Sequence, residues 1–316
     1  MGKAGLVSVI IINYNGCDLL KECLSSVTAQ SYAPIEIIVV DNGSVDSSVE
    51  FLRNNYPQVK LILNKENLGF AEAANQGILK AKGEFIALLN NDACADPHWI
   101  SSLVKVMLEN PQIGSCASKL INYNDHKIID AVGLLLHRAG FAKSRAHQQV
   151  DSGQFDIIEE VFACHGAAAF YRKKMLEEIG LFDADYFAYN EEFDLGLRAQ
   201  LAGFRCLYVP QAVVYHQGGK TRAKQDEEFR LYHMERNRLW TIFKDWPIGF
   251  FFFCFPYFLK YELEILLNLN KYNKKAVIKA RIDFLKRLPQ ILKKRYYIQR
   301  KRKVSIKYLR NLIKNN

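Results

Sequence analysis

The 316-residue sequence lacks the marks of several protein classes. Its seven cysteines are odd in number and form no C-x-x-C pair. This argues against a disulfide-stapled domain and against a cysteine-ligated zinc, and favours a reducing cytosol. The first predicted strand begins within about six residues of Met1, so we expect no signal peptide. No internal repeat or low-complexity linker occurs. With 49% apolar residues, the chain suffices for one large α/β domain plus additions.

Acidic residues are almost absent from residues 271–316. That stretch holds seventeen Lys and Arg and a single acidic residue, Asp283, whereas the remainder of the chain is net negative, at −6. The overall charge of +10 therefore belongs to the tail alone. Such asymmetry predicts an anionic partner, either a membrane or a nucleic acid.

A run of about 20 apolar residues, as a membrane-spanning helix requires, is also missing here. The uncharged stretch Trp246–Leu259 has 14 residues, includes Phe250–Phe253 and is interrupted by Pro247 and Pro256. It can lie in a bilayer interface or pack as a buried helix. Because a basic tail follows, we expect residues 246–316 to form a helical, aromatic and basic extension that binds an anionic membrane surface. The alternative is a core helix followed by a solvated tail.

Strand and helix patterns alternate through the first 110 residues. Apolar runs predict strands at 7–13, 36–41, 59–63 and 85–89, and amphipathic stretches predict helices at 18–30, after the cap at 46–48, at 69–82 and at 97–109. Four strand–helix units predict an α/β fold, with a mostly parallel sheet and helices on both faces.

The pattern then loosens. Residues 121–160 carry little periodicity, so we expect loops or edge strands there. Further strands are predicted at 167–171 and 204–209, a helix at 191–202, and helices from Asp226 to the end.

Polar residues stand where three of the predicted strands end. Asn13-Tyr14-Asn15, Asp41-Asn42 and Asn90-Asn91-Asp92 each follow an apolar run. Ligands of open α/β sheets bind beyond the carboxyl ends of the strands, so these residues describe one site. Their carboxylates and amides suit a base, a ribose and a metal-bound diphosphate. We therefore predict a nucleotide-dependent enzyme.

Each of these segments also has a purely structural interpretation. Asp92 can bind a divalent cation, Mg or Mn, together with substrate phosphates, or it can serve as a turn or helix cap. Gly69 stands at a predicted helix start, in the segment Asn67–Asn75, where backbone N–H groups can approach a ligand. The turn at 41–44 is equally plausible without a ligand, because Gly43 is free to take positive φ.

Three carboxylates open the helix predicted at 191–202. Glu191, Glu192 and Asp194 follow Asn190, a natural N-cap, and acidic residues complement the helix dipole there. Asp194 can pair with Arg198 at i+4, which leaves Glu192 free to take a proton. We therefore regard the three acidic residues as catalytic candidates, with Glu192 first and Glu191 as its rival.

A histidine followed by two glycines ends another apolar run. His216 precedes Gln217-Gly218-Gly219. An imidazole there suits a phosphate or a metal, and the glycines allow a close backbone approach. His165-Gly166 is a candidate for the acceptor side.

The motifs taken together resemble the family-2 glycosyltransferases of GT-A fold, and most closely their bacterial rhamnosyltransferase-like branch, which builds surface polysaccharides. The resemblance covers roughly residues 6–245, and its segments are 10–15, 39–46, 67–77, 88–92, 166–183, 191–198 and 216–219. It implies a catalytic domain at 1–245, with a nucleotide-sugar half at about 1–120 and an acceptor half at about 121–245.

The resemblance also implies a reaction, an inverting transfer from a nucleotide-diphosphate sugar that depends on a divalent cation. The donor would be a dTDP- or UDP-sugar and the acceptor a saccharide or a lipid-linked saccharide. Asp41 matches the position that binds the base, Asn91 the ribose position and Asp92 the metal position. Glu192 matches the catalytic base, and His216 matches the late metal or diphosphate ligand. The enzyme would be cytoplasmic and peripheral at the inner face of the cell membrane.

Two departures from the family pattern bear on these roles. Family members often have Asp where this chain has Asn90 and Asn91. Asp92 is therefore the one carboxylate of this triplet that can carry the metal, with His216 as a second ligand. The base position holds Glu where Asp is common, which keeps Glu191 as a rival to Glu192.

Two other functions fit the sequence less well. A sugar-phosphate nucleotidyltransferase usually has a Gly-rich loop bearing Arg and Lys after its first strand, and residues 13–17 are not such a loop. A nucleic-acid-binding protein would explain the tail but not the polar strand ends, and the negative remainder offers no second basic face. We therefore expect no nucleic-acid partner.

Overall fold

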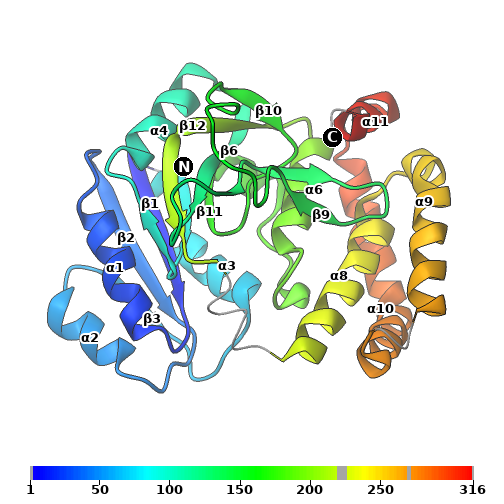
Figure 1. The fold of residues 1–316 in the computed structure, drawn as a ribbon, viewed down its shortest axis with the longest axis horizontal. Helices are drawn as coiled ribbons and strands as arrows, with labels where there is room; N and C mark the ends of the chain where they lie inside the picture. Colours follow the sequence, from blue (N-terminus) through cyan, green and yellow to red (C-terminus); the bar gives the residue numbers. More distant parts are fainter. Residues whose placement is uncertain (1–2, 219–225, 269–271, 315–316) are drawn as a thin grey trace.

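The computed structural model describes residues 3–218, 226–268 and 272–314 (Figure 1). Strands alternate with helices in the first third of the chain. Its elements are β1 (Lys3–Asn13), α1 (Cys17–Thr28), β2 (Ile35–Asp41), α2 (Ser48–Asn55), β3 (Lys60–Leu63), α3 (Phe70–Lys80), β4 (Gly83–Asn90), β5 (Ala93–Ala95) and α4 (Trp99–Glu109). All four strands and four helices predicted for this region are confirmed to within a few residues.

The middle third contains two long strands, several short ones and three helices. They are β6 (Ile113–Asn122), β7 (Ile129–Ala131), β8 (Leu134–Leu136), β9 (Ala142–Ser144), β10 (Glu159–Val161), β11 (Ala168–Arg172), α5 (Lys173–Ile179), the 3-10 helix η1 (Ala184–Tyr186), α6 (Glu191–Leu201) and β12 (Arg205–His216). Most strands at 121–160 are three residues long, as the weak periodicity of that region predicted.

One large sheet holds most of these strands, in the order β10-β12-β6-β11-β4-β1-β2-β3. Strands β3, β2, β1 and β4 are parallel, β12 is parallel to β6, and β11 runs antiparallel to both of its neighbours. Helices α1, α2 and α4 pack on one face of the sheet, and α3, α5 and α6 pack on the other. The predicted mostly parallel sheet with helices on both faces is confirmed.

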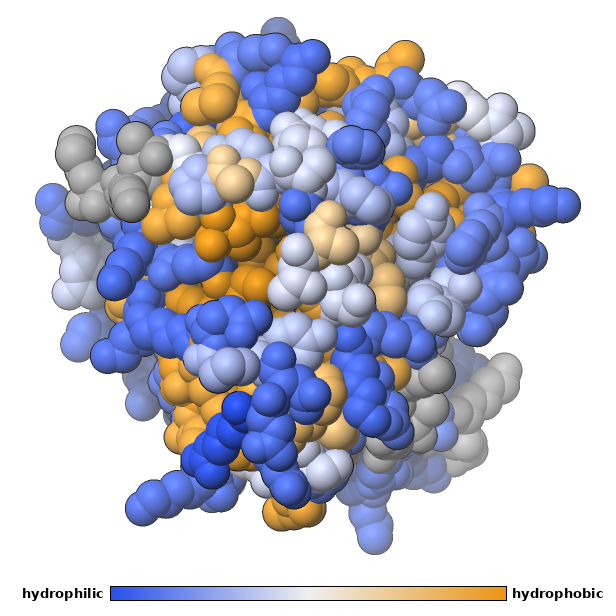
Figure 2. All heavy atoms as spheres, turned by 90° about the vertical axis from the view of Figure 1, so that its left-hand side faces the viewer, coloured by the Kyte–Doolittle hydropathy of each residue, from blue (hydrophilic) through white to orange (hydrophobic). Residues whose placement is uncertain are grey.

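Strand register sets the polar ends level with one another. Asn13 of β1 pairs with Asp41 of β2, and Ile12 of β1 pairs with Asn90 of β4. The side chains at these strand ends therefore meet at one edge of the sheet, as the sequence predicted. Helices α1 and α2 cover the flank of the nucleotide half that lies on the left in Figure 1. From that side, hydrophilic side chains cover most of the outline and hydrophobic ones gather near the middle (Figure 2).

Four helices follow the sheet. They are α8 (Glu227–Asp245), α9 (Ile248–Leu267), α10 (Lys274–Arg300) and α11 (Ile306–Lys314). The predicted helical C-terminal region is confirmed, and it lies on the side of the molecule away from β1–β3 (Figure 1). Among the described residues, no helix is long and apolar enough to cross a membrane.

The C-terminal helices share the hydrophobic core of the rest of the protein. Phe284 and Ile291 of α10 are buried with Tyr186 and Trp240, and Leu309 of α11 is buried in the cluster that contains Leu197 of α6. The predicted boundary between residues 245 and 246 therefore does not separate two independent cores. Helices α10 and α11 both bury apolar side chains, so this part of the chain is not fully solvated.

Candidate active site

A chain of hydrogen bonds joins the three polar strand ends. Asn13 donates from Nδ2 to Oδ2 of Asp41 at 3.0 Å, and its Oδ1 accepts from Nδ2 of Asn91 at 2.9 Å. All three side chains are buried. Sequence reasoning grouped these residues from their position alone, and the structure brings them together. The arrangement lines the sheet edge with amide and carboxylate groups whose orientations are fixed.

The turns after β1 and β2 hold each other in place. Asp41 accepts at its second oxygen from the backbone N–H of Ser44, at 2.9 Å. Asn15, in the left-handed region at φ 49°, accepts from the N–H of Val45 at 2.8 Å. A Cβ on Gly43, where φ is 84°, would lie 2.7 Å from the backbone of Glu66. Tyr14 stands beside this rigid surface, 43% exposed, so its ring is available to a ligand.

Asn42 differs from its predicted ligand role. Its Nδ2 donates to Asn67 and to the carbonyl of Gly69, and its Oδ1 accepts from Asn64 and from the N–H of Leu68. The side chain is 2% exposed, and these four bonds use its donors and acceptors. Asn42 therefore shapes the loop before α3 and has nothing left to offer a nucleotide.

Gly69 and Asn75 also support the protein instead of facing a ligand. A Cβ on Gly69 would lie 2.4 Å from the carbonyl oxygen of Phe187, so the glycine admits a backbone segment and not a phosphate. Asn75 donates to the carbonyl of Phe182 at 2.8 Å and accepts from its N–H at 3.0 Å. In both cases the partner in the structure is a segment more than 100 residues away in the chain. The two residues fix the 182–187 segment against α3.

The imidazole of His216 lies between two carboxylates, those of Asp92 and Asp130. Oδ1 of Asp92 lies 3.4 Å from Nε2 of His216, and Nδ1 of His216 lies 2.7 Å from Oδ2 of Asp130. Burial alone would lower the pKa of His216, but hydrogen bonds to Asp130 and Asp92 and their charges outweigh it and raise the pKa to about 9. Asp130, on β7, was missed in the sequence because it lies in the stretch without periodicity.

The pair fits a divalent cation shared with a substrate. Asp92 and His216 are both less than 10% exposed. With a cation in place of the Nε2 proton of His216, they would present one carboxylate and one imidazole nitrogen. A carboxylate behind the imidazole, as Asp130 provides, commonly orients a metal-binding histidine. In the part of the chain that the structure describes, no group of three or more His, Cys, Asp or Glu could hold a metal ion. Mg²⁺ typically takes few protein ligands and completes its shell with phosphate oxygens and water, so two protein donors are consistent with such a site.

His165 connects this pair to the catalytic candidates on α6. Its ring lies against that of His216, with 6.1 Å between centroids, and its Nδ1 accepts from the N–H of Ala167 at 3.2 Å. Burial lowers the pKa of His165 to about 4, so its ring is neutral near pH 7. A Cβ on the adjacent Gly166 would lie 3.8 Å from the carboxyl carbon of Glu192. The His165-Gly166 segment therefore lies between His216 and Glu192.

Glu191 and Glu192 lie at the start of α6 in different surroundings. Glu191 is 7% exposed, and its Oε2 has no hydrogen-bond partner among the described residues. Glu192 is only partly buried, beside Gly166. Burial raises the pKa of both carboxyls, and the charge of Glu192 raises that of Glu191 further. Asn190 adopts a left-handed conformation and donates to the carbonyl of Met234, so its side chain does not cap the helix as predicted.

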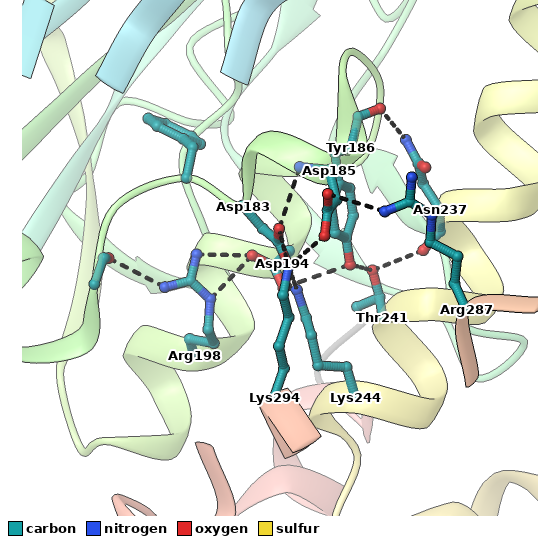
Figure 3. Close-up of polar contacts among 12 residues, drawn as sticks. Asp183, Asp185, Tyr186, Asp194, Arg198, Asn237, Thr241, Lys244, Arg287 and Lys294 are labelled. Carbon is teal, nitrogen blue, oxygen red and sulfur yellow. Dashed lines mark hydrogen bonds and ion pairs between the residues drawn. The ribbon is translucent and has the colours of Figure 1, made fainter. Parts of the chain in front are cut away.

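Asp194 is not placed for catalysis. It is fully buried, and its carboxylate pairs with Arg198 at 2.7 Å and with Lys244 (Figure 3). Burial alone would raise the pKa of Asp194, but these two cations hold it well below its usual range. The predicted Arg198 pair is confirmed, but a carboxylate that stays ionised and enclosed cannot exchange protons with a substrate. Asp194 therefore belongs to the support of α6.

Comparison with known proteins identifies the family of the chain. The family model for "Glycosyl transferase family 2" matches residues 8–180. An uncharacterized glycosyltransferase of Rickettsia typhi, RT0329, is 30% identical over 192 residues, which are 60% of this chain and 57% of that protein. Another, from Haemophilus influenzae, is 36% identical over 123 residues, or 38% of each chain. The chain thus covers less than two thirds of the length of these relatives.

Solved structures extend the likeness to the whole chain. The mannosyltransferase PcManGT from Pyrobaculum calidifontis, in complex with GDP-Man and Mn²⁺, has a TM-score of 0.56 at 18% identity and covers 98% of this chain and 79% of its own. Staphylococcus aureus TarS 1-349 has a TM-score of 0.61 at 17% identity and covers 98% and 90%. At such identities the likeness speaks for the fold, here that of the GT-A glycosyltransferases. The chain, matched by the family model over more than half of its length, belongs to glycosyl transferase family 2.

Proposed function

We propose that the protein is an inverting hexosyltransferase that moves a sugar from a nucleotide-diphosphate donor to a saccharide or lipid-linked saccharide in surface polysaccharide synthesis. A dTDP- or UDP-sugar is the proposed donor, with rhamnose as the sugar to test first. One observation supports this best: the hydrogen-bonded strand ends lead directly to the Asp92–His216 pair, and His165-Gly166 links that pair to Glu192. A donor site, a cation site and a base thus follow one another along the sheet edge.

The donor half of the mechanism rests on fixed polar groups. In this proposal Asp41 accepts from a base N–H and Asn91 contacts the ribose, and hydrogen bonds to Asn13 hold both side chains. Asp92 and His216 would hold the cation, which when bound offsets the charge on the departing diphosphate. The solved structures of PcManGT and of GalNAc-T7, with UDP, GalNAc and Mn²⁺, hold the same kinds of ligand, a nucleotide or nucleotide sugar and a divalent cation.

The acceptor half rests on Glu192. A general base is most effective when its pKa lies near the working pH, and burial raises the pKa of this carboxyl toward that range. Glu192 accepts the proton of the acceptor hydroxyl as the oxygen bonds to the anomeric carbon and the bond to the diphosphate breaks. A single displacement of this kind inverts the anomeric configuration.

The donor can be found by ligand-dependent stabilisation. With Mn²⁺ present, one nucleotide sugar of a panel should raise the melting temperature, because a ligand at about 100 times its Kd stabilises the native state by roughly 2.7 kcal/mol. The panel should contain dTDP-, UDP- and GDP-sugars, and the same nucleotides without sugar serve as controls. Transfer to a saccharide acceptor is then measured by the release of nucleoside diphosphate. Release of pyrophosphate from a nucleoside triphosphate and a sugar phosphate would instead show a nucleotidyltransferase.

We further propose that the enzyme works in the cytoplasm, peripherally at the inner face of the cell membrane, where a lipid-linked acceptor would be available. The charge distribution supports this, because residues 271–316 carry seventeen basic residues and one acidic residue. Anionic lipids attract such segments, by about 1 kcal/mol for each basic side chain near the surface.

A further inference from the structure

Helix α9 exposes a stripe of large apolar side chains to solvent. Its members recur at intervals of three or four residues and are between 39% and 69% exposed: Ile248, Phe252, Phe255, Leu259, Leu263 and Leu266. This spacing places them on one side of the helix. The opposite side holds the buried residues Phe250, Cys254 and Ile265. The helix therefore has two apolar sides, of which the protein covers only one.

Helix α10 exposes a second stripe with the same spacing. Its members are between 46% and 62% exposed: Ile278, Ile282, Leu285, Leu292 and Tyr296. Pro289 is exposed and lies four residues after Leu285 and three before Leu292, so it continues the spacing between them. The buried residues of this helix, among them Phe284 and Ile291, lie on a different side.

The two stripes lie on one outward face. Phe258 of α9 and Phe284 of α10 both contact Phe243 of α8, with ring centroids 6.5 and 4.9 Å away. Arg281 of α10 donates to Glu262 of α9 at 3.0 Å, so these two positions mark the sides on which the helices face each other. An α-helix turns by about 100° per residue, so the centre of each stripe can be located around its own helix axis. On each helix that centre lies roughly 50–60° from the residue that faces the other helix, on the side away from α8. Both stripes therefore face outward from the α9–α10 pair.

Basic side chains border this face along α10. Lys275, Lys286, Lys293 and Arg300 are exposed and lie at intervals of seven or eleven residues, on the flank of the apolar stripe that is farther from α9. Monomeric proteins rarely leave a large apolar face in water without a partner. A second copy of the chain is a poor partner, because a symmetric dimer would place two identical basic borders near each other.

We propose that the outward face of α9 and α10 docks on an anionic lipid bilayer. The apolar stripes insert at the depth of the headgroups, and the lysines and Arg300 contact anionic lipids along the border. An apolar insertion combined with a basic patch gives the two signals that stable peripheral attachment needs. This inference deepens the membrane attachment of the proposed function and rests on it, and it specifies which face of the extension makes the contact.

Vesicle sedimentation tests the docking face. The full-length protein should pellet with vesicles of phosphatidylglycerol and phosphatidylcholine, more weakly with phosphatidylcholine alone and more weakly at high salt. The double variant Phe252→Glu/Leu285→Glu should lose binding to both lipids. Lys286→Glu/Lys293→Glu should reduce binding to the anionic vesicles by tenfold or more, because two attractive charges become repulsive. Leu108→Glu, at an equally exposed leucine on α4 (59%), is the matched control and should bind like the wild type.

Two outcomes would overturn this proposal. One is equal pelleting of the wild type and both double variants. The other is a wild-type dimer in solution that becomes monomeric in Phe252→Glu/Leu285→Glu without any vesicle binding, since a second copy would then cover the face. Transfer to a water-soluble acceptor is measured in parallel. Vesicle binding does not depend on that activity, so a failure of the transferase proposal remains separate.

A different observation carries a second proposal, which concerns the backbone before α6. Phe187, Tyr189 and Asn190 have φ of 65°, 69° and 66°, in the left-handed region that residues other than glycine seldom adopt. Such a conformation costs about 1–3 kcal/mol per residue and persists only when its surroundings hold it. The strained segment lies directly before Glu191 and Glu192, so its conformation sets where α6 begins.

A buried amide helps to hold this segment, next to Arg236, which donates to the carbonyls of Asp185 and Tyr186. Nδ2 of Asn237, on α8, lies 3.0, 2.9 and 2.7 Å from the carbonyl oxygens of Tyr186, Ala188 and Tyr189. Asn237 is fully buried, and Figure 3 shows it beside Tyr186. Lys294 of α10 adds support from outside the loop, through ion pairs of 2.5 and 2.7 Å to Asp183 and Asp185. The loop is thus held from two of the C-terminal helices.

We infer that Asn237 is a positioning residue for the proposed base. By fixing three carbonyls of the strained loop, it fixes the start of α6 and with it the carboxylate of Glu192. Among the residues that the structure describes, its side chain forms no hydrogen bond with a predicted donor-site residue, so its effect should fall on turnover and not on donor binding. A displacement of about 1 Å in a catalytic group can lower a rate by as much as 10²-fold.

The isosteric variant Asn237→Asp tests this role, because it keeps the shape of the side chain and removes the donors. We expect kcat to fall by about 10- to 100-fold while the donor Kd, from Mn²⁺-dependent thermal shift, stays within about twofold. The acid limb of the pH–rate profile should also move, since the surroundings of Glu192 change. Lys294→Met is the control for a general loss of stability in this region. An unchanged kcat, or an equal loss of donor affinity and turnover in both variants, would overturn the inference.

Discussion

Replacing Asp92 with alanine should abolish sugar transfer and remove the part of donor binding that depends on Mn²⁺ or Mg²⁺. This carboxylate stands alone, because the two preceding positions are Asn90 and Asn91. Without it His216 is the single remaining protein ligand proposed for the cation. The negative charge that develops on the diphosphate is then no longer offset by a bound cation. Removing one preorganised electrostatic contact typically costs 10²–10³-fold in kcat, so loss of the cation as well should cost at least roughly 10³-fold.

Further variants distinguish a loss of cation binding from a loss of folding. Asp130→Asn should leave transfer intact at high Mn²⁺ but weaken Mn²⁺ binding by about 10- to 100-fold, the usual effect of removing the group that orients a metal-binding histidine. Thermal unfolding without ligands reports whether the fold survives each change. A chelator should stop the wild-type enzyme completely. Undiminished transfer in excess chelator, or an active Asp92→Ala, would contradict the metal role.

The donor side of the site could be predicted because it depends on short-range patterns. Each strand of the nucleotide half is a continuous apolar run, and the polar residue that ends it is visible in the sequence. Parallel pairing in register then brings Asn13 level with Asp41 without further information. The same logic grouped Asn91 with them, and its side chain donates to Asn13 in the structure.

The residues that were missed or misplaced have partners far away in the chain. Asp130 contacts His216 across 86 positions, and no local pattern marks its three-residue strand. Asn75 resembled a ligand-binding amide, but it serves Phe182, 107 residues away. Gly69 was recognised correctly as a position that needs a close approach, but the approaching group is the carbonyl of Phe187. A single sequence shows which polar groups such residues carry, but it does not show which distant residues they contact.

Strand β6 and helix α9 show two further limits. Strand β6 lies inside the sheet, yet its residues 113–118 include glycine, two serines and a cysteine and do not read as an apolar run. The sequence predicted α9 as an apolar segment that either meets a membrane or packs internally. In the structure Phe250 and Cys254 are buried while Phe252 and Phe255 are exposed, because tertiary packing divides one apolar helix into two faces. Composition alone could not make that division.

The choice between Glu191 and Glu192 depends on what each carboxyl can reach. Glu191 is enclosed, with one oxygen lacking a partner among the described residues, whereas Glu192 is partly exposed beside Gly166 and close to the His165–His216 contact. A base has to touch the acceptor hydroxyl, so exposure favours Glu192. Burial raises the pKa of both carboxyls, so neither is fully ionised at the low end of the pH range.

Glu192→Gln should therefore lower kcat by about 10²–10⁴-fold while the donor Kd stays nearly unchanged, since a base acts on the acceptor. The wild-type rate should rise with pH through the raised carboxyl pKa, because the base must be ionised, and this limb should disappear in Glu192→Gln. Glu191→Gln is the matched control. It should keep most of the activity and unfold at a higher temperature at neutral pH, because a folded-state pKa above the unfolded value means that ionising Glu191 opposes folding. If Glu191→Gln loses turnover and Glu192→Gln does not, the base is Glu191 and the assignment of Glu192 is wrong.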